Sequence, residues 1–462
     1  MSSKPEITKV AFPVFGIAWH THINGTSILA HCGGGGSARS GIGNSIVITH
    51  YTPDSQAYMR LTIDTMDQIC VGVAIGASFL GHNIDRNQFD PDVVVVAAVG
   101  NEIRLYSAFT GRLLSKEHTL ETEKAGVNCV AMSADGTMVL CGCESGRVLS
   151  YKLQGLPQPD PNANGEEKKG EEGDGEGPNT QEEKEEEVYA VTELIQLAEM
   201  VSHEKAVCCV CFRPGEVARC ISSAKDGSCR EWDARTGKML AVMQCSAGPP
   251  PEQRGGRKIP HQILVRGCAY SPDGDFVYTC ASGRRGRAFL GKWKRMKPDP
   301  TKKMPAFLPV ENCCVAECPV SAMSMSGDGT MAALGSVEGN ISFIGLEGMN
   351  LIRTFSVHDL PVTCITARPT PLNWAPLKNM KNLTIDAVSA SADNKIALIS
   401  AQSRRMTWMG LLQRLFWLLV FGTIGKYCYD ECEIEIMSGD FESIKQCLCG
   451  PPPSFVTAFP PH

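Results

Sequence analysis

One local pattern recurs along this chain: a short alternating strand that ends in a tight turn containing Gly. Three copies align directly, at residues 127–136, 267–274 and 320–329. Alternating apolar and polar residues indicate a strand with one buried face, and Asp-Gly pairs favour tight turns between strands. Before residue 405, no segment has the periodicity of a long amphipathic helix. The pattern therefore predicts an all-β fold built from repeated units.

A second spacing recurs within these units. A turn is followed six residues later by a large apolar residue that closes a strand, as from Asp226 to Trp232. The same step links Ser145 to Tyr151, Glu338 to Ile344 and Asp393 to Ile399. Equivalent strands at Val320 and Pro361 are about 40 residues apart, which is the period of WD repeats. The chain resembles WD-repeat proteins, although Trp232-Asp233 is its one Trp-Asp dipeptide.

The resemblance predicts a seven-bladed WD-repeat β-propeller over residues 1–405. A ring of blades leaves only short protected sheet edges, so a partial ring is physically unfavourable. The expected blades span residues 7–55, 57–110, 124–153, 190–243, 262–297, 318–348 and 358–402. Six or eight blades stay open as alternatives, because residues 82–91 are irregular. WD-repeat blades use a structural hydrogen-bond chain, and its expected members here are His203, Ser223, Asp226 and Trp232, with His358 in the equivalent place of the seventh blade.

An acidic segment, residues 156–188, interrupts the path from the third expected blade to the fourth. It holds 12 acidic and 3 basic residues, a net charge of -9, so the rest of the chain sums to about +3. Glu, Gly, Pro and Asn dominate it, and such a composition buries too little apolar surface to fold. We expect a disordered acidic insertion. The near-neutral remainder argues against nucleic acid as a partner.

The C-terminal part contains an apolar stretch, residues 406–425, that is long enough for a single transmembrane helix. Gln413 and Arg414 make its insertion marginal, and an amphipathic surface helix or an oligomer contact is the alternative. Basic residues precede the stretch and acidic residues follow it, so the propeller is expected in the cytosol. The tail, residues 426–462, is then lumenal, and its four cysteines suit disulfides: Cys428, Cys432, Cys447 and Cys449.

The most unusual segment is the glycine-rich stretch over residues 31–44, which lies between two strands of the first expected blade. A turn of two to five residues would join these strands, so the connection is over-long. It lacks the lysine of a phosphate-binding loop, and strands flank it where such a loop needs a strand and a helix. Neither a nucleotide site nor another site for a small-molecule substrate is expected.

The segments 12–19, 30–36 and 40–44 resemble the first blade of one family of WD-repeat proteins. This is the prolactin regulatory element-binding protein family, the guanine-nucleotide exchange factors of the endoplasmic reticulum for the COPII small GTPase. The layout of loop, propeller and single C-terminal span matches as well. The resemblance implies a single-pass protein of the endoplasmic reticulum membrane that acts in ER-to-Golgi protein transport. It would promote GDP release by binding, without covalent chemistry.

The resemblance also implies roles for the loop residues. Gly41, Ile42, Gly43 and Asn44 would form the exchange loop that contacts the GTPase. A potassium ion would be held by Gly33, Gly34, Gly35, Gly36 and Asn44, since oxygen ligands suit a hard cation and glycine lets carbonyls converge. The family has proline where this chain has Gly43, and glycine makes the loop tip less rigid.

Two further functions compete with exchange: a non-catalytic WD-repeat scaffold at the membrane, and a promoter-binding regulator. The membrane tail and the near-neutral propeller disfavour the regulator.

A basic run over residues 284–297 is expected to be a solvated blade edge, with an acidic partner or anionic lipid as the alternative. Cys141 and Cys143, and Cys313, Cys314 and Cys318, could bind a metal, but they lack zinc spacing. Most cysteines lie in apolar runs, as at residues 207–211, and are expected to be core residues in a reducing compartment.

Overall fold

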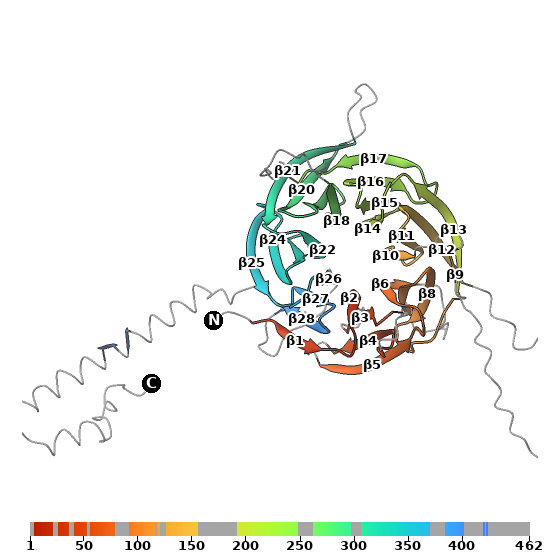
Figure 1. The fold of residues 1–462 in the computed structure, drawn as a ribbon, viewed down its shortest axis with the longest axis horizontal. Coiled ribbons are helices and arrows are strands. Elements are labelled where there is room, and N and C mark those ends of the chain that lie inside the picture. Colours follow the sequence, from red (N-terminus) through yellow and green to blue (C-terminus); the bar gives the residue numbers. More distant parts are fainter. Residues whose placement is uncertain are drawn as a thin grey trace, which may run out of the picture. The chain divides into compact units, whose positions relative to one another are not determined.

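The computed structural model describes residues 4–21, 26–36, 41–52, 56–78, 92–115, 118–120, 126–155, 192–247, 262–296, 306–369, 384–401, 419–420 and 422–423. They belong to two units: one comprises residues 3–402, and the other comprises residues 1–2 and 403–462. The first unit is a ring of seven four-stranded antiparallel sheets around a central axis (Figure 1). This confirms the predicted all-β, seven-bladed propeller.

Each blade runs from an inner strand near the axis to an outer strand at the rim (Figure 1). Blade one comprises β2 (Val14–Thr21), β3 (Ser27–Gly33), β4 (Ser45–Tyr51) and β5 (Ala57–Asp64). Blade two comprises β6 (Cys70–Ser78), β7 (Asp92–Val99), β8 (Glu102–Ser107) and β9 (His118–Thr119). Blade three comprises β10 (Val127–Met132), β11 (Met138–Cys143), β12 (Arg147–Gly155) and β13 (Thr192–Val201). Blade four comprises β14 (Val207–Arg213), β15 (Glu216–Ala224), β16 (Ser228–Asp233) and β17 (Met239–Gln244). Blade five comprises β18 (Ile263–Tyr270), β19 (Phe276–Gly283), β20 (Ala288–Arg295) and β21 (Phe307–Ala316). Blade six comprises β22 (Val320–Met325), β23 (Met331–Ser336), β24 (Asn340–Gly345) and β25 (Asn350–Ser356).

The seventh blade closes the ring with strands from both ends of the propeller. β26 (Val362–Ala367), β27 (Ala387–Ser391) and β28 (Lys395–Ile399) are joined at the rim by β1 (Glu6–Lys9). β1 pairs antiparallel with β28, with Ile7 opposite Ala397. The expectation that residue 7 begins the first blade was therefore wrong. In a closed ring the first strand of the chain serves the last blade, and the sequence repeat is offset from the blade by one strand.

The same offset changes which strands flank the acidic insertion. β13 pairs with β12 in a register that sets Gly155 opposite Thr192. β13 therefore completes the third blade and does not open the fourth, as the predicted boundary at residue 190 had it. The insertion departs between the third and fourth strands of one blade, at two backbone positions that face each other. Its own residues, 156–188, lie outside the described part of the chain.

The core consists of apolar layers between neighbouring blades. All residues of β3, β11, β23 and β27 are buried, because each second strand is covered by a blade on both faces. At the closure, Trp19 and Leu29 of blade one pack in a cluster with Val388 and Ile396 of blade seven. Each fully buried side chain of this size contributes roughly 1.5–3 kcal/mol. The ring is thus closed by side-chain packing as well as by strand pairing.

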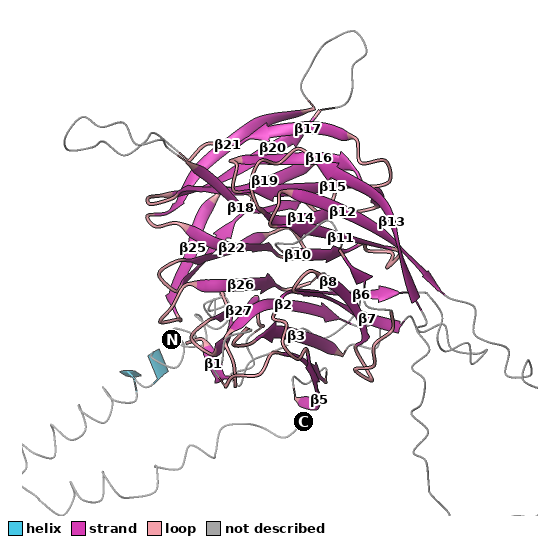
Figure 2. Ribbon diagram, turned by 45° about the vertical axis from the view of Figure 1, so that its right-hand side comes forward, coloured by secondary structure: helices cyan, strands magenta, loops and turns pink. Residues whose placement is uncertain are grey.

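The second unit contributes four described residues, Leu419, Val420, Gly422 and Thr423, and all four are helical (cyan in Figure 2). Among the residues that the structure describes, no helix has the length and hydrophobicity needed to cross a bilayer. Most of the predicted span, residues 406–425, lies outside the described residues. The predicted lumenal tail, residues 426–462, lies outside them entirely.

Candidate functional site

The glycine-rich segment is the connection between β3 and β4 in blade one, as predicted. Gly33 and Ser45 form the last pair of the hairpin, and β4 pairs with β5 on its other side. The strand includes His31, Cys32 and Gly33, so it runs further into the predicted loop than expected. The connection is therefore residues 34–44, of which residues 37–40 lie outside the described part.

Asn44 fixes the base of this connection. Its side chain is 2% exposed. Oδ1 accepts a hydrogen bond from the Gly36 N–H at 2.9 Å, and Nδ2 donates to the carbonyls of Gly36 at 3.3 Å and Met66 at 2.9 Å. The Asn44 carbonyl accepts from the Thr65 N–H at 3.0 Å. One buried amide thus joins the two ends of the loop and ties them to the turn after β5.

The first two glycines meet close backbone neighbours. A Cβ on Gly33 would lie 1.9 Å from the carbonyl oxygen of Pro13. Gly34 has φ of +144°, and a Cβ there would lie 2.3 Å from Asn44 Oδ1. Both positions therefore require glycine. Gly33 lies in β3, while Gly34, Gly35 and Gly36 follow in the connection.

The tip presents Ile42 to solvent. Gly41, Ile42 and Gly43 are exposed, with Ile42 at 37%. Gly43 has no positive φ, and a Cβ there would meet nothing within 4 Å. Position 43 therefore does not require glycine. A Cβ at this position, such as that of proline, would lie in open space.

The turn after β5 is a part of the site that the sequence had not indicated. Met66 adopts a left-handed φ of 57°, which is uncommon for a residue with a side chain. Its N–H donates to Asp64 Oδ1 at 2.8 Å, and its carbonyl accepts from Asn44. Its side chain is 73% exposed. An Asp two residues before an exposed Met was the only available signal, and it is common in surface turns.

Potassium ligation remains a prediction. A backbone carbonyl oxygen has two lone pairs, so a hydrogen-bonded carbonyl such as that of Gly36 can still coordinate a cation. Asn44 Oδ1 already accepts from Gly36, so it offers its remaining lone pair. The donor set is thus compatible with a monovalent cation. No group of three or more His, Cys, Asp or Glu side chains suited to a metal occurs among the described residues.

The hydrogen-bond chain of blade four is present with one correction. His203 contacts Asp226 through Nδ1 at 2.8 Å and Ser222 through Nε2 at 2.8 Å, and Trp232 Nε1 donates to Ser222. The serine is Ser222 and not Ser223, because alternate residues of β15 point to opposite faces. The Ser223 hydroxyl is buried and has no hydrogen-bond partner among the described residues.

Blade seven repeats the chain without its tryptophan. His358 contacts Asp393 at 3.1 Å and Ser389 at 2.9 Å. Hydrogen bonds hold the pKa of Asp226 well below its usual range, despite the opposing effect of burial. These histidines join a loop, a turn and a strand, which is a structural role. This agrees with the structural hydrogen-bond chain that the sequence predicted.

Three residues of the basic run have partners within the propeller. Arg295 pairs with buried Glu231 at 3.1 Å, and Arg287 pairs with Glu317 at 2.7 Å. Lys292 lies 4.8 Å from the centre of the Phe276 ring.

No disulfide joins the cysteines of the described strands and loops. Burial raises the pKa of Cys211 to about 12, as expected for a core thiol.

The WD domain, G-beta repeat family matches residues 114–151 and 195–233. Each match begins near the outer strand of one blade and ends with the third strand of the next, which is the offset seen in the fold. No curated protein sequence matches the chain. Together with seven four-stranded blades, the matches identify the chain as a WD-repeat protein. Membership of a particular exchange-factor family stays a prediction.

Proposed function

We propose that this WD-repeat protein is a guanine-nucleotide exchange factor for the small GTPase of the COPII coat. The observation that supports it most is the hairpin of blade one, where Asn44 anchors both ends of the connection and Ile42 stands exposed between two exposed glycines. An anchored base with an apolar tip is suited to entering a partner's surface. The residues also resemble the first blade of the exchange factors.

The proposed mechanism is differential binding. Exchange is promoted when the loop binds the nucleotide-free GTPase more tightly than the GDP-bound form. Burial of Ile42 against the partner would supply apolar contact, at roughly 25 cal/mol per Å². Asn44 holds the loop in place before the partner binds. Less of the binding energy is therefore offset by the entropy lost when the loop is ordered. A potassium ion, when bound, would supply a charge that draws the glycine carbonyls together.

The proposed location is the endoplasmic reticulum membrane, with residues 406–425 as the single span, the propeller cytosolic and residues 426–462 lumenal. This part rests on the sequence alone. A membrane tether would confine the propeller to the surface where the GTPase is loaded. Fractionation of cells expressing the full chain tests it, and recovery in the soluble fraction would contradict it.

The exchange proposal is tested by GDP release from the purified GTPase, using the full-length chain in detergent micelles. Ile42→Ala is expected to slow stimulated release at least tenfold, because the tip loses its apolar contact. Leu351→Ala is the matched control, since Leu351 is 56% exposed on the rim of blade six. Replacing potassium by lithium at equal ionic strength is expected to weaken stimulation. Equal activity of both variants would contradict the proposal.

A second candidate is a scaffold that binds partners without exchange. Gly43 favours it, because the tip has neither proline nor a strained backbone to hold it. A scaffold would bind the GTPase equally in its GDP-bound and nucleotide-free states. Comparing the two affinities by calorimetry separates the candidates, since exchange requires tighter binding to the nucleotide-free state.

A further inference from the structure

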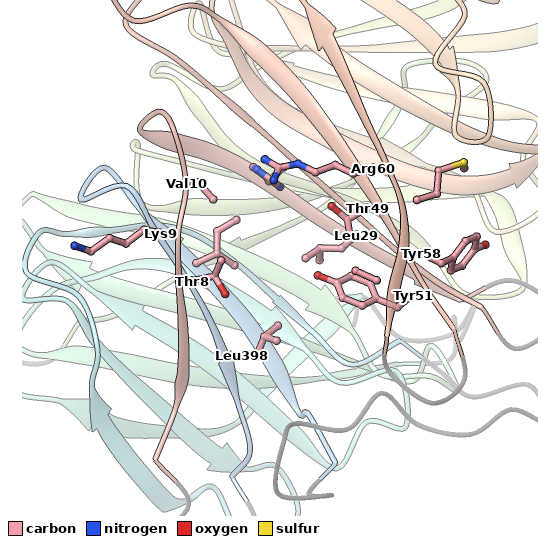
Figure 3. A pocket seen from close by; sticks show the side chains of 13 residues that line it. Thr8, Lys9, Val10, Leu29, Thr49, Tyr51, Tyr58, Arg60 and Leu398 are labelled. Carbon is pink, nitrogen blue, oxygen red and sulfur yellow. The ribbon is translucent and has the colours of Figure 1, made fainter.

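A cavity of about 360 Å³ lies where blade seven meets blade one (Figure 3). β1 and β28 line it on one side, and β3, β4 and β5 line it on the other. Its lining includes Leu29 and Ile396, which also pack at the ring closure. The exchange proposal does not use the cavity. Its volume is in the range of sites that hold one small molecule or one or two side chains.

A buried histidine lines the cavity. His31 of β3 is 4% exposed, and within the described part of the chain neither ring nitrogen has a hydrogen-bond partner. Phe12 stacks on it, with ring centres 5.7 Å apart. Burial, with a smaller effect of Arg60, lowers the pKa of His31 to about 4, so the ring is neutral. A neutral imidazole has one donor and one acceptor, and buried groups of this kind are normally satisfied.

Arg60 supplies the positive charge. It is exposed on β5, and in Figure 3 its guanidinium extends across the cavity towards Val10, the residue after β1. Among the described residues it makes no ion pair and no hydrogen bond. Lys9 also borders the cavity, but Figure 3 shows its ammonium pointing the opposite way. One cation therefore faces the cavity, beside a neutral donor.

The other end is more apolar. Leu29 and Leu398 line the walls, and Tyr51 lies beside Leu398 in Figure 3. Burial raises the pKa of Tyr51; Glu6 adds to this effect and Arg60 opposes it. Arg60 attracts a negative group, while Leu29 and Leu398 offer apolar surface to the body that carries it. The cavity thus has a defined polarity, with an anion end and an apolar end.

We infer that this inter-blade cavity binds a singly charged carboxylate carried on an apolar body. The carboxylate pairs with Arg60 and accepts a hydrogen bond from His31, while the body lies between Leu29 and Leu398. A phosphate dianion would need more than one facing cation, so a carboxylate fits better. Its source is either an acidic residue of a short peptide or a free carboxylic acid. The inference does not rest on nucleotide exchange.

Calorimetry on the full-length chain tests it with hexanoate and with hexanol, a neutral probe of similar length. We expect hexanoate to bind and hexanol to bind at least tenfold more weakly. Arg60→Gln is expected to weaken hexanoate binding at least tenfold. Lys9→Gln is the matched control: it removes the same charge from the same rim but faces away, so affinity should stay within twofold.

A peptide arm distinguishes the sources. N-acetyl-Leu-Glu-Phe-amide is compared with its Gln analogue, and binding of the Glu peptide at least tenfold tighter than hexanoate identifies a peptide as the ligand. The reverse order identifies a free acid. The inference is overturned if neither carboxylate binds, if hexanol binds as well as hexanoate, or if both charge variants weaken binding equally. Thermal melts of the variants confirm that each is folded.

Discussion

The side chain of Asn44 satisfies backbone groups from two separate turns, so its loss should be felt in both. Asn44→Ala leaves the Gly36 N–H and the Met66 carbonyl without their partner. We expect a loss of about 1–3 kcal/mol in the free energy of unfolding, measured by urea denaturation. We also expect stimulated GDP release to fall at least tenfold, because the loop loses its anchor.

The control is Asn312→Ala, on the outer strand of blade five. Asn312 is exposed, and its amide donates to the Ser246 carbonyl at 3.4 Å. Its substitution should change the free energy of unfolding by less than about 0.5 kcal/mol. Equal losses for the two variants would show that the Asn44 contacts do not hold the loop.

His31 should make the propeller less stable in mild acid. Its pKa is about 4 in the folded chain and about 6.5 when unfolded, so between these values only the unfolded chain takes up the proton. Stability is fully present above about pH 6.5 and falls as the pH drops towards 4. The expected loss from this one residue is about 2 kcal/mol between pH 7 and pH 5.

Urea denaturation of the wild type and of His31→Phe at pH 7, 6 and 5 measures this effect. Phenylalanine keeps a ring against Phe12 but cannot be protonated. The variant should therefore lose about 2 kcal/mol less than the wild type over this range. Parallel pH profiles for the two chains would rule out His31 as the source of the acid sensitivity.

At this scale the sequence indicated residue types better than residue partners. Asp226 and Trp232 were expected in the blade-four chain and are found there, whereas Ser222 takes the place expected for Ser223. The two serines are adjacent and chemically identical, so only the direction of β15 distinguishes them. Met66 and the cavity around His31 were not foreseen, because their partners are set by packing between distant segments.

At the scale of elements, the hydrogen-bond chain of blade four makes a sharp prediction. Ser222→Ala leaves His203 Nε2 and Trp232 Nε1 buried without their shared partner. It should cost about 1–3 kcal/mol in the free energy of unfolding. Ser223→Ala, one residue away, removes a buried hydroxyl that has no partner among the described residues, and should be neutral or stabilising. A larger loss for Ser223→Ala, by thermal or urea melts, would contradict this assignment.

The strands were predictable to the extent that they repeat. The turn-to-strand spacing located the third strands, as with Trp232 in β16 and Ile399 in β28. The outer strands β1, β5 and β13 were assigned to the wrong blades, since an outer strand precedes the inner strand of the next blade in sequence. Pairing with the earlier blade is a long-range choice that the local pattern does not express.

At the scale of the whole molecule, β1 is the part whose loss should affect every blade. Removing residues 1–10 deletes the rim strand of blade seven and exposes the edge of β28. We expect a lower Tm by calorimetry and self-association on gel filtration, because an unpaired edge recruits other strands. Removing residues 1–4, which leaves Glu6–Lys9 intact, is the control and should leave both measurements unchanged. An unaltered Tm in the longer deletion would show that the ring does not depend on β1.

The pairing of β1 with β28 also affects how the chain folds during synthesis. β1 leaves the ribosome before every other described strand, yet its partner in blade seven follows about 390 residues later. At about 5–20 residues per second, β1 waits on the order of 20–80 s before it can pair. During that interval the growing chain has a full set of early blades but no closed ring. A chaperone that shields strand edges would therefore be needed most in the seconds before residues 395–399 emerge.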